Sequence, residues 1–84
     1  MKIVFATRAW DDYLWWQRKD RRGLERVNTL IRDIQRDPQA GIGKPERLAH
    51  GLAGLSSRRI DREHRIVYRV EGDALLIVQL RFHY

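Results

Sequence analysis

The stretch RIVYRVEGDALLIVQLRFHY, residues 65–84, contains the alternation of apolar and polar side chains that decides the fold. Its two apolar runs, residues 65–70 and 74–84, are separated by Glu-Gly-Asp, a combination typical of a turn between antiparallel strands. The segment SSRRI, residues 56–60, precedes them and is separated from residue 65 by the polar turn 61–64. We therefore predict three strands joined by two antiparallel hairpins.

The register of the last hairpin determines which side chains are buried, because a shift by one residue turns every side chain to the other face. A two-residue turn at Gly72 and Asp73 would mix apolar and polar side chains on one face, whereas a three-residue loop, residues 72–74, would separate them. We predict the three-residue loop, with Phe82 anchoring the chain end in the core. The predicted core face comprises Ile60, Ile66, Tyr68, Val70, Leu76, Val78, Leu80 and Phe82.

The N-terminal half has helical periodicity after a short apolar run, residues 2–5, that suits a strand. Residues 8–19 predict a first helix, with Thr7 as its cap. Gly23 interrupts the pattern, and a second helix follows as far as Asp37. Its apolar stripe, which we expect in the core, consists of Leu24, Val27, Leu30, Ile31 and Ile34.

Helices that precede strands predict an α+β fold: a small antiparallel β-sheet with two N-terminal helices packed on one face. At 84 residues, the chain suits a single domain, residues 1–84. The absence of cysteine excludes disulfides, thiolate metal sites and thiol nucleophiles, and fits a reducing compartment, so we expect a cytoplasmic protein. The apolar run near the N-terminus is too short for a signal sequence or a membrane span, so no membrane is expected.

The charge favours a polyanionic partner. Lysine and arginine number 17 against 11 acidic residues, which gives a net charge of +6, and only three of the 17 are lysines. Arginine is suited to bidentate phosphate binding and to stacking on bases, because its guanidinium is planar, forked and always charged. We therefore expect a polyanion, RNA above all, while a GC-rich genome that favours arginine codons is the alternative.

The face opposite the predicted core would bring several arginines beside a histidine, and the loop residues Lys44, Glu46 and Arg47 would lie near its rim. Cleavage of RNA without a metal needs a base for the 2′-hydroxyl, cations for the phosphoryl oxygens and an acid for the departing 5′-oxygen. A glutamate, arginines and a histidine match these roles in kind. The alternative is a set of arginines that splay apart into water. The residues predicted to share this face are Arg59, Arg65, Arg69, Arg81 and His83.

No metal or cofactor is expected. His50, His64 and His83 lack metal-ligand spacing, and no glycine-rich phosphate loop follows a strand. We interpret His50 as a loop residue and His64 as a turn residue. Trp10, Trp15 and Trp16 raise the alternative of stacking on bases, but for Trp10 we expect packing in the helix core.

Five motifs in order carry a resemblance over essentially the whole chain: WDDYLWWQ, GKPERL, SRRI, EHRIVY and the terminal RFHY. Together they resemble the YoeB-type toxins of the RelE and ParE superfamily. The resemblance implies a RelE-like fold and the toxin of a bacterial type II toxin–antitoxin system. It also implies a metal-independent endoribonuclease that cuts mRNA in the ribosomal A site and so inhibits translation.

Carried over by residue, the resemblance implies that Glu46 is the general base, Arg65 the cation at the phosphate, His83 the general acid and Tyr84 the residue that orients the nucleotide. The expected RNA-binding residues are Lys44, Arg47, Arg59 and Arg81. Two positions depart from the family: Ala49 replaces a frequent lysine and Ser56 a frequent aromatic residue. These departures affect a phosphate contact and packing.

The resemblance also implies partners: an acidic, YefM-like antitoxin, the 70S ribosome with its rRNA and mRNA, and a homodimer as an option. The net charge of +6 gives a physical reason for affinity toward an acidic partner. Two alternatives remain open at this point. One is a ParE-like inhibitor of DNA gyrase, whose relatives generally lack the terminal His-Tyr, and the other is a basic RNA-binding module without catalysis.

Overall fold

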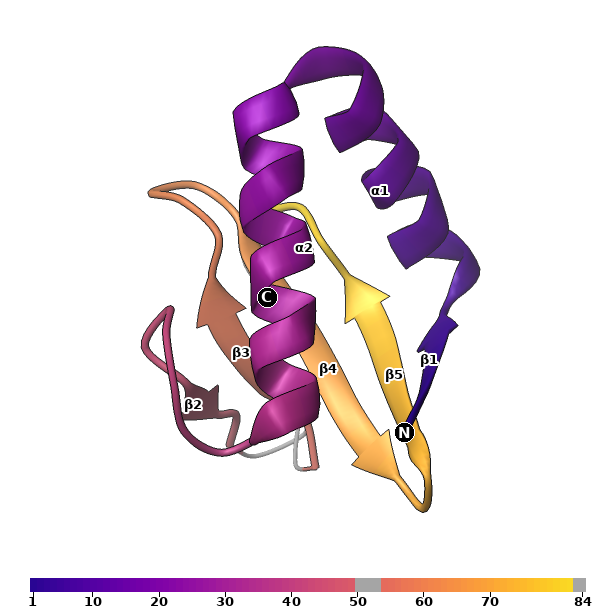
Figure 1. Ribbon diagram of the computed structural model, residues 1–84, viewed down its shortest axis with the longest axis vertical. Coiled ribbons are helices and arrows are strands. Elements are labelled where there is room, and N and C mark those ends of the chain that lie inside the picture. The colour runs from indigo at the N-terminus through magenta and orange to yellow at the C-terminus, as the bar shows by residue number, and fades with distance from the viewer. Residues whose placement is uncertain (50–53, 83–84) are drawn as a thin grey trace.

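The computed structural model describes residues 1–49 and 54–82, which form two helices and a five-stranded sheet (Figure 1). The sheet has the order β1-β5-β4-β3-β2. The α+β prediction is confirmed, with one difference: β1 runs parallel to β5, so the sheet is mixed, although its other pairs are antiparallel. The elements are β1 Lys2–Phe5, α1 Thr7–Lys19, α2 Arg21–Arg36, β2 Glu46–Arg47, β3 Ser56–Arg59, β4 Arg65–Glu71 and β5 Ala74–Gln79.

Both helices pack on one face of the sheet, and Figure 1 shows α2 running across it with α1 beside it. The apolar stripe of α2 predicted from its periodicity lies in the core, apart from Leu24 at its margin. Trp16 of α1 is also buried, and its indole Nε1 donates to the Leu80 carbonyl at 2.9 Å. The strands and the residues directly after them contribute Ile60, Ile66, Tyr68, Leu75, Ile77 and Leu80 to the core.

Two details of the helices differ from the sequence prediction. Thr7 is the first residue of α1 rather than its cap, which is Ala6. Gly23 does not interrupt the helices but lies inside α2, which starts after the cap Asp20; the Asp20 carboxylate accepts from the Gly23 N–H at 2.9 Å. A Cβ on residue 23 would lie 2.1 Å from the Trp16 ring, so glycine is needed for close packing rather than to end a helix.

The predicted three-residue loop is wrong. Glu71 pairs with Ala74 across a two-residue turn, and Gly72 adopts the positive φ of 56° that such turns favour. With this turn alone, apolar and polar side chains would be mixed on one face. A bulge in the pairing of β4 with β5 beside Val67 shifts the register by one residue and so corrects the mixing beyond it, because a bulge adds one residue to one strand only.

This bulge changes which side chains of β5 are buried. Leu75 and Ile77 face the core in place of the predicted Leu76 and Val78, which are half-buried. Beyond the bulge the side chains alternate as predicted, so Leu80 is fully buried. Val70 and Phe82, both predicted in the core, are 39% and 44% exposed. The chain end is therefore not anchored by burial of Phe82.

Within residues 1–49 and 54–82, neither helix is long and apolar enough to cross a membrane.

Candidate functional site

The side chains of strand β3 alternate between the two faces of the sheet at the candidate site. Arg58 points toward the helices, where its guanidinium donates to Asp33 Oδ2 of α2 at 2.5 Å. Because successive side chains of a strand alternate, Ser57 and Arg59 point to the opposite face. Their cross-strand partners are Val67 and Arg65 of β4, respectively. The candidate site is built on this second face.

The buried Arg58 fixes the loop that leads to β2. Its guanidinium has no exposed surface, and it binds backbone carbonyls instead of water. Tyr68 joins the same network, since its hydroxyl donates to the Pro38 carbonyl at 2.7 Å. Five donors in a rigid fork suit this task. The loop carbonyls that accept from Arg58 belong to Asp37 at 2.6 Å, Ala40 at 3.1 Å and Ile42 at 3.2 Å.

Asp33 balances the buried charge of Arg58. The pKa of its carboxyl lies below the ordinary aspartate value, chiefly because it accepts from the Ile42 N–H and then from Arg58, with a smaller contribution from Arg36; burial acts in the opposite direction. The carboxylate thus links α2 to the loop that carries Lys44 and leads to Glu46 of β2.

Glu46 and Arg65 come together on the second face, as the sequence analysis required for a shared site. Arg65 Nη2 lies 3.6 Å from Glu46 Oε2, and Arg65 Nε donates to Ser57 Oγ at 3.0 Å. The two partners differ in access: the Glu46 side chain is 55% exposed, whereas that of Arg65 is 9% exposed. Glu46 is therefore the group open to a ligand, and Arg65 lies beneath it.

The end of the chain passes beside this pair. The Arg65 N–H donates to the Phe82 carbonyl at 3.1 Å. His83 and Tyr84, predicted as acid and orienting residue, follow Phe82 in the sequence but lie outside the described residues, as does His50.

The predicted arginine face is brought together only in part. Arg59 is exposed and is the cross-strand neighbour of Arg65. Arg69 instead pairs with Glu71 farther along β4. Arg81 is directed to α1, where its guanidinium carbon lies 3.8 Å from the centroid of the Trp15 ring. Arg69 thus stays on the same face as Arg65 with its charge paired, whereas stacking directs Arg81 away from that face.

Of the predicted rim residues, Glu46 pairs with Ser57 on the second face, whereas Arg47 pairs with Ser56 and so points to the helix side of the sheet. Lys44 is exposed and adopts a positive φ of 54° after Gly43. Arg47 is also exposed, and its Nε donates to the Gln39 side chain at 3.0 Å. Of the positions that depart from the family, Ala49 is exposed and Ser56 is buried in β3.

Sequence reasoning missed two residues that hold this site. Ser57 was not singled out, although it lies two residues before Arg59 and hence on the same strand face. His64 was interpreted as a turn residue, which its position confirms, yet it is buried at 5% exposure and its Nδ1 accepts from the Phe82 N–H at 2.8 Å. Strand alternation could have placed Ser57 on this face, whereas the contact of His64 with Phe82 has no signal in the sequence.

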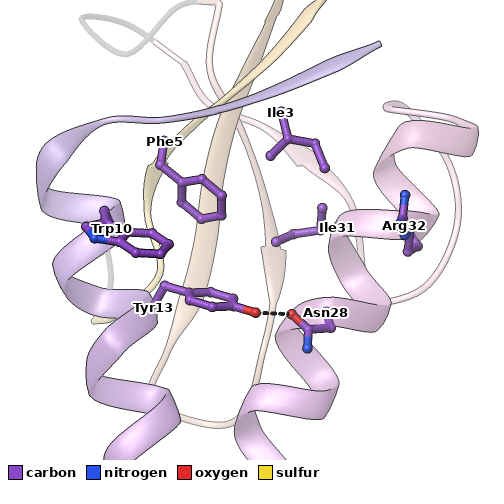
Figure 2. A pocket seen from close by; sticks show the side chains of 7 residues that line it. All are labelled: Ile3, Phe5, Trp10, Tyr13, Asn28, Ile31 and Arg32. Carbon is purple, nitrogen blue, oxygen red and sulfur yellow. Dashed lines mark hydrogen bonds between the residues drawn. The ribbon is translucent and has the colours of Figure 1, made fainter.

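A separate apolar groove of about 460 Å³ lies at the other edge of the sheet, between β1 and the two helices (Figure 2). Trp10 and Tyr13 stack there with their rings 9° from parallel, and Phe5 meets both edge-on. Trp10 is 47% exposed, so its predicted place in the helix core is wrong. The groove is lined by Ile3, Phe5, Trp10, Tyr13, Asn28, Ile31 and Arg32.

Comparison with known proteins places residues 5–84 within the family described as YoeB-like toxin of bacterial type II toxin–antitoxin systems. The YoeB toxin of Escherichia coli K12 is 51% identical over 84 residues, which cover all of both chains. A YoeB/ParE toxin structure from Agrobacterium tumefaciens superposes with a TM-score of 0.97 at 53% identity, again over both whole chains. A YoeB dimer and a heterotetrameric YoeB–YefM complex, both from Staphylococcus aureus, are 39% identical, with TM-scores of 0.93 and 0.91 over 100% of this chain and 98% of theirs.

Proposed function

Since the chain belongs to the YoeB-like toxins of bacterial type II toxin–antitoxin systems, we propose that it is a ribosome-dependent endoribonuclease that cleaves mRNA in the A site and so inhibits translation. The observation that carries this proposal is the pairing of Glu46 with Arg65, 3.6 Å apart, on the sheet face away from the helices. The exposed carboxylate and the cation beneath it supply two of the three groups that metal-independent RNA cleavage needs.

The proposed reaction is an internal transesterification. Glu46 takes the proton of the 2′-hydroxyl, and the 2′-oxygen forms a bond to the neighbouring phosphorus. Arg65 stabilises the charge that builds on the phosphoryl oxygens. His83 gives its proton to the 5′-oxygen as the bond from phosphorus to that oxygen breaks. The products are a 2′,3′-cyclic phosphate and a 5′-hydroxyl, and Tyr84 orients the scissile nucleotide.

The RNA is held by cations around this pair. Lys44 and Arg47 flank Glu46 in the sequence, and Arg59 is the exposed neighbour of Arg65. Each can bind a phosphate, which neutralises charge and releases counterions. Arg81 is the fourth proposed contact, although its guanidinium is stacked on Trp15 and would have to turn toward the RNA.

Primer extension on ribosome-bound mRNA with purified protein tests this function. Wild-type protein is expected to cut mRNA at the A-site codon, and Glu46→Gln to cut about 100-fold to 10,000-fold more slowly, since it lacks the proton acceptor. Glu25→Gln, the same change at an exposed residue of α2, is the matched control and should keep the wild-type rate.

The alternatives predict other outcomes. Stalled DNA gyrase without mRNA cleavage would favour a gyrase inhibitor. Binding to RNA without cleavage, unaffected by Glu46→Gln, would favour a module without catalysis. Either result would contradict the proposed reaction.

We further propose an acidic, YefM-like antitoxin as partner, as in the YoeB–YefM complex from S. aureus. The net charge of +6 supports affinity for an acidic segment that folds on binding. An acidic protein is expected to co-purify with the chain from its native operon at moderate salt. Recovery of the chain alone, at high yield and without growth arrest, would contradict this.

The S. aureus dimer supports a homodimer as the state of the free toxin, to be checked by sedimentation. A substrate on translating ribosomes places the proposed activity in the cytoplasm.

A further inference from the structure

The segment that follows β5 leaves the sheet and is held by other parts of the molecule. Its first residue, Leu80, is bound from α1: Asp12 Oδ2 accepts from its N–H at 3.0 Å, and Trp16 Nε1 donates to its carbonyl at 2.9 Å. Two residues later, Phe82 is bound from the turn between β3 and β4. His64 Nδ1 accepts from the Phe82 N–H at 2.8 Å, and the Arg65 N–H donates to the Phe82 carbonyl at 3.1 Å.

Phe82 needs this support because its backbone adopts a left-handed conformation, with φ at 66°. Residues with a Cβ rarely adopt such a φ unless their surroundings impose it. Phe82 is 44% exposed, so burial does not impose this conformation. The two hydrogen bonds of its backbone N–H and carbonyl impose it instead. Of these two bonds, only the one that His64 accepts involves a side chain.

His64 is itself held rigidly. Its ring packs edge-on against Trp16, with centroids 5.1 Å apart, and the backbone N–H of His64 donates to Asp61 Oδ1 at 2.7 Å. Nε2 lies 3.7 Å from the Glu63 carboxylate. This arrangement suits a neutral ring that carries its hydrogen on Nε2 and accepts at Nδ1.

We propose that His64 is a positioning residue for RNA cleavage: by accepting from the Phe82 N–H, it fixes the backbone from which His83 and Tyr84 extend. This inference rests on the proposed function, in which those two residues act on the scissile nucleotide. His64 touches no reacting atom in this account. It acts through Phe82, and its neighbour Arg65 joins the same backbone to the Glu46 pair.

Two nearly isosteric substitutions separate the hydrogen bond from packing. His64→Asn keeps an acceptor bonded to Cγ, the place that Nδ1 occupies, whereas His64→Leu keeps the branched shape but has no acceptor. We expect His64→Leu to lower the single-turnover rate of cleavage on programmed ribosomes about 100-fold, since small displacements of acting groups cost that much. Affinity for the ribosome should stay within about twofold, and His64→Asn should recover most of the rate.

Amide hydrogen exchange at Phe82 reports the hydrogen bond directly, without catalysis. It should be faster in His64→Leu than in wild type or His64→Asn, while exchange at Leu80, held from α1, stays slow. If His64→Leu does not fold, His64→Gln replaces it, because its acceptor is one bond farther from Cγ and misses the Phe82 N–H.

The outcomes separate this inference from the proposed function. Wild-type protein that cuts no mRNA would contradict the function, whereas the exchange at Phe82 would still test the hydrogen bond. Cleavage and Phe82 exchange at wild-type levels in His64→Leu would overturn the role of His64 alone. Equal loss of rate in the Leu and Asn variants would also overturn it, because packing and not the acceptor would then be responsible.

Discussion

Single side chains hold the two segments that carry the candidate site. Arg58, fully buried, binds the carbonyls of the loop before Glu46, and His64 binds the backbone of Phe82. Both are polar residues inside a small protein, where an unpaired polar group is costly. Each side chain makes hydrogen bonds to backbone groups of an irregular segment. Each can therefore remain buried only while that segment keeps its conformation.

Phe82 is expected to contribute little to stability. Its exposed ring contacts only Arg81 and His64 among the aromatic and cationic neighbours described, so Phe82→Ala should lower the free energy of unfolding by at most about 1 kcal/mol. Leu80→Ala is the comparison: the fully buried side chain should cost roughly 2–5 kcal/mol. Urea unfolding measures both, and a larger loss for Phe82 than for Leu80 would contradict this.

His83→Gln tests the proposed acid. RNA binding should be kept, because the charges that bind phosphate remain, while cleavage should slow about 100-fold or more because the 5′-oxygen leaves without a proton. Product that still forms should end in a 2′,3′-cyclic phosphate. Deleting His83 and Tyr84 should abolish cleavage, and wild-type cutting by the truncated chain would place the acid elsewhere.

Asp33 makes stability dependent on acid pH. Its folded pKa is lowered by the hydrogen bonds from Ile42 and Arg58, so its contribution is fully present above the unfolded pKa, about 3.9, and is lost as pH falls through the folded value. Asp33→Asn should lower the thermal midpoint at pH 7, and the difference from wild type should shrink at the acid end of the range. Asp11→Asn, an exposed residue of α1, is the control and should change the midpoint little. A constant difference across pH would contradict the role of this charge.

Between elements, the junction of α1 with α2 depends on a close approach. Gly23 lies inside α2, where alanine is normally favoured by about 1 kcal/mol. Here its Cβ would meet the buried Trp16 ring at 2.1 Å, so we expect Gly23→Ala to destabilise the fold by about 1–3 kcal/mol. Arg22→Ala, exposed in the same turn, should be nearly neutral. Chemical unfolding measures both, and a stabilised Gly23→Ala would show that α1 can move away at little cost.

Across the whole molecule, the strand order places the apolar groove and the candidate site at opposite edges of the sheet. The apolar groove adjoins β1 at one edge of the sheet, whereas Glu46 lies on β2 at the other (Figures 1 and 2). Phosphate binding should therefore depend on cations near β2 and β3 and not on those of β1.

Salt dependence distinguishes the two edges. Binding to RNA should weaken steeply with salt, and Arg59→Gln should reduce the slope of log K against log salt by about one phosphate contact. Lys2→Gln removes the same charge from β1 at the far edge and is the matched control, with a slope close to that of wild type. Equal slopes for all three proteins would show that Arg59 does not contact the backbone of the nucleic acid.

The sequence by itself determined the α+β class, the apolar stripe of α2, the strands of the two hairpins and the family, because periodicity, turn residues and motif order are local properties of the chain. It also predicted that Glu46 and Arg65 would share one site, and the structure places the two side chains 3.6 Å apart. Only the tertiary structure decided the bulge beside Val67, the exposure of Phe82 and the roles of Arg58, Ser57 and His64. These features depend on contacts between residues far apart in the chain. A bulge changes which side chains of a strand face the core, and a hydrogen bond from a buried polar side chain can hold a chain segment whose own side chain is exposed.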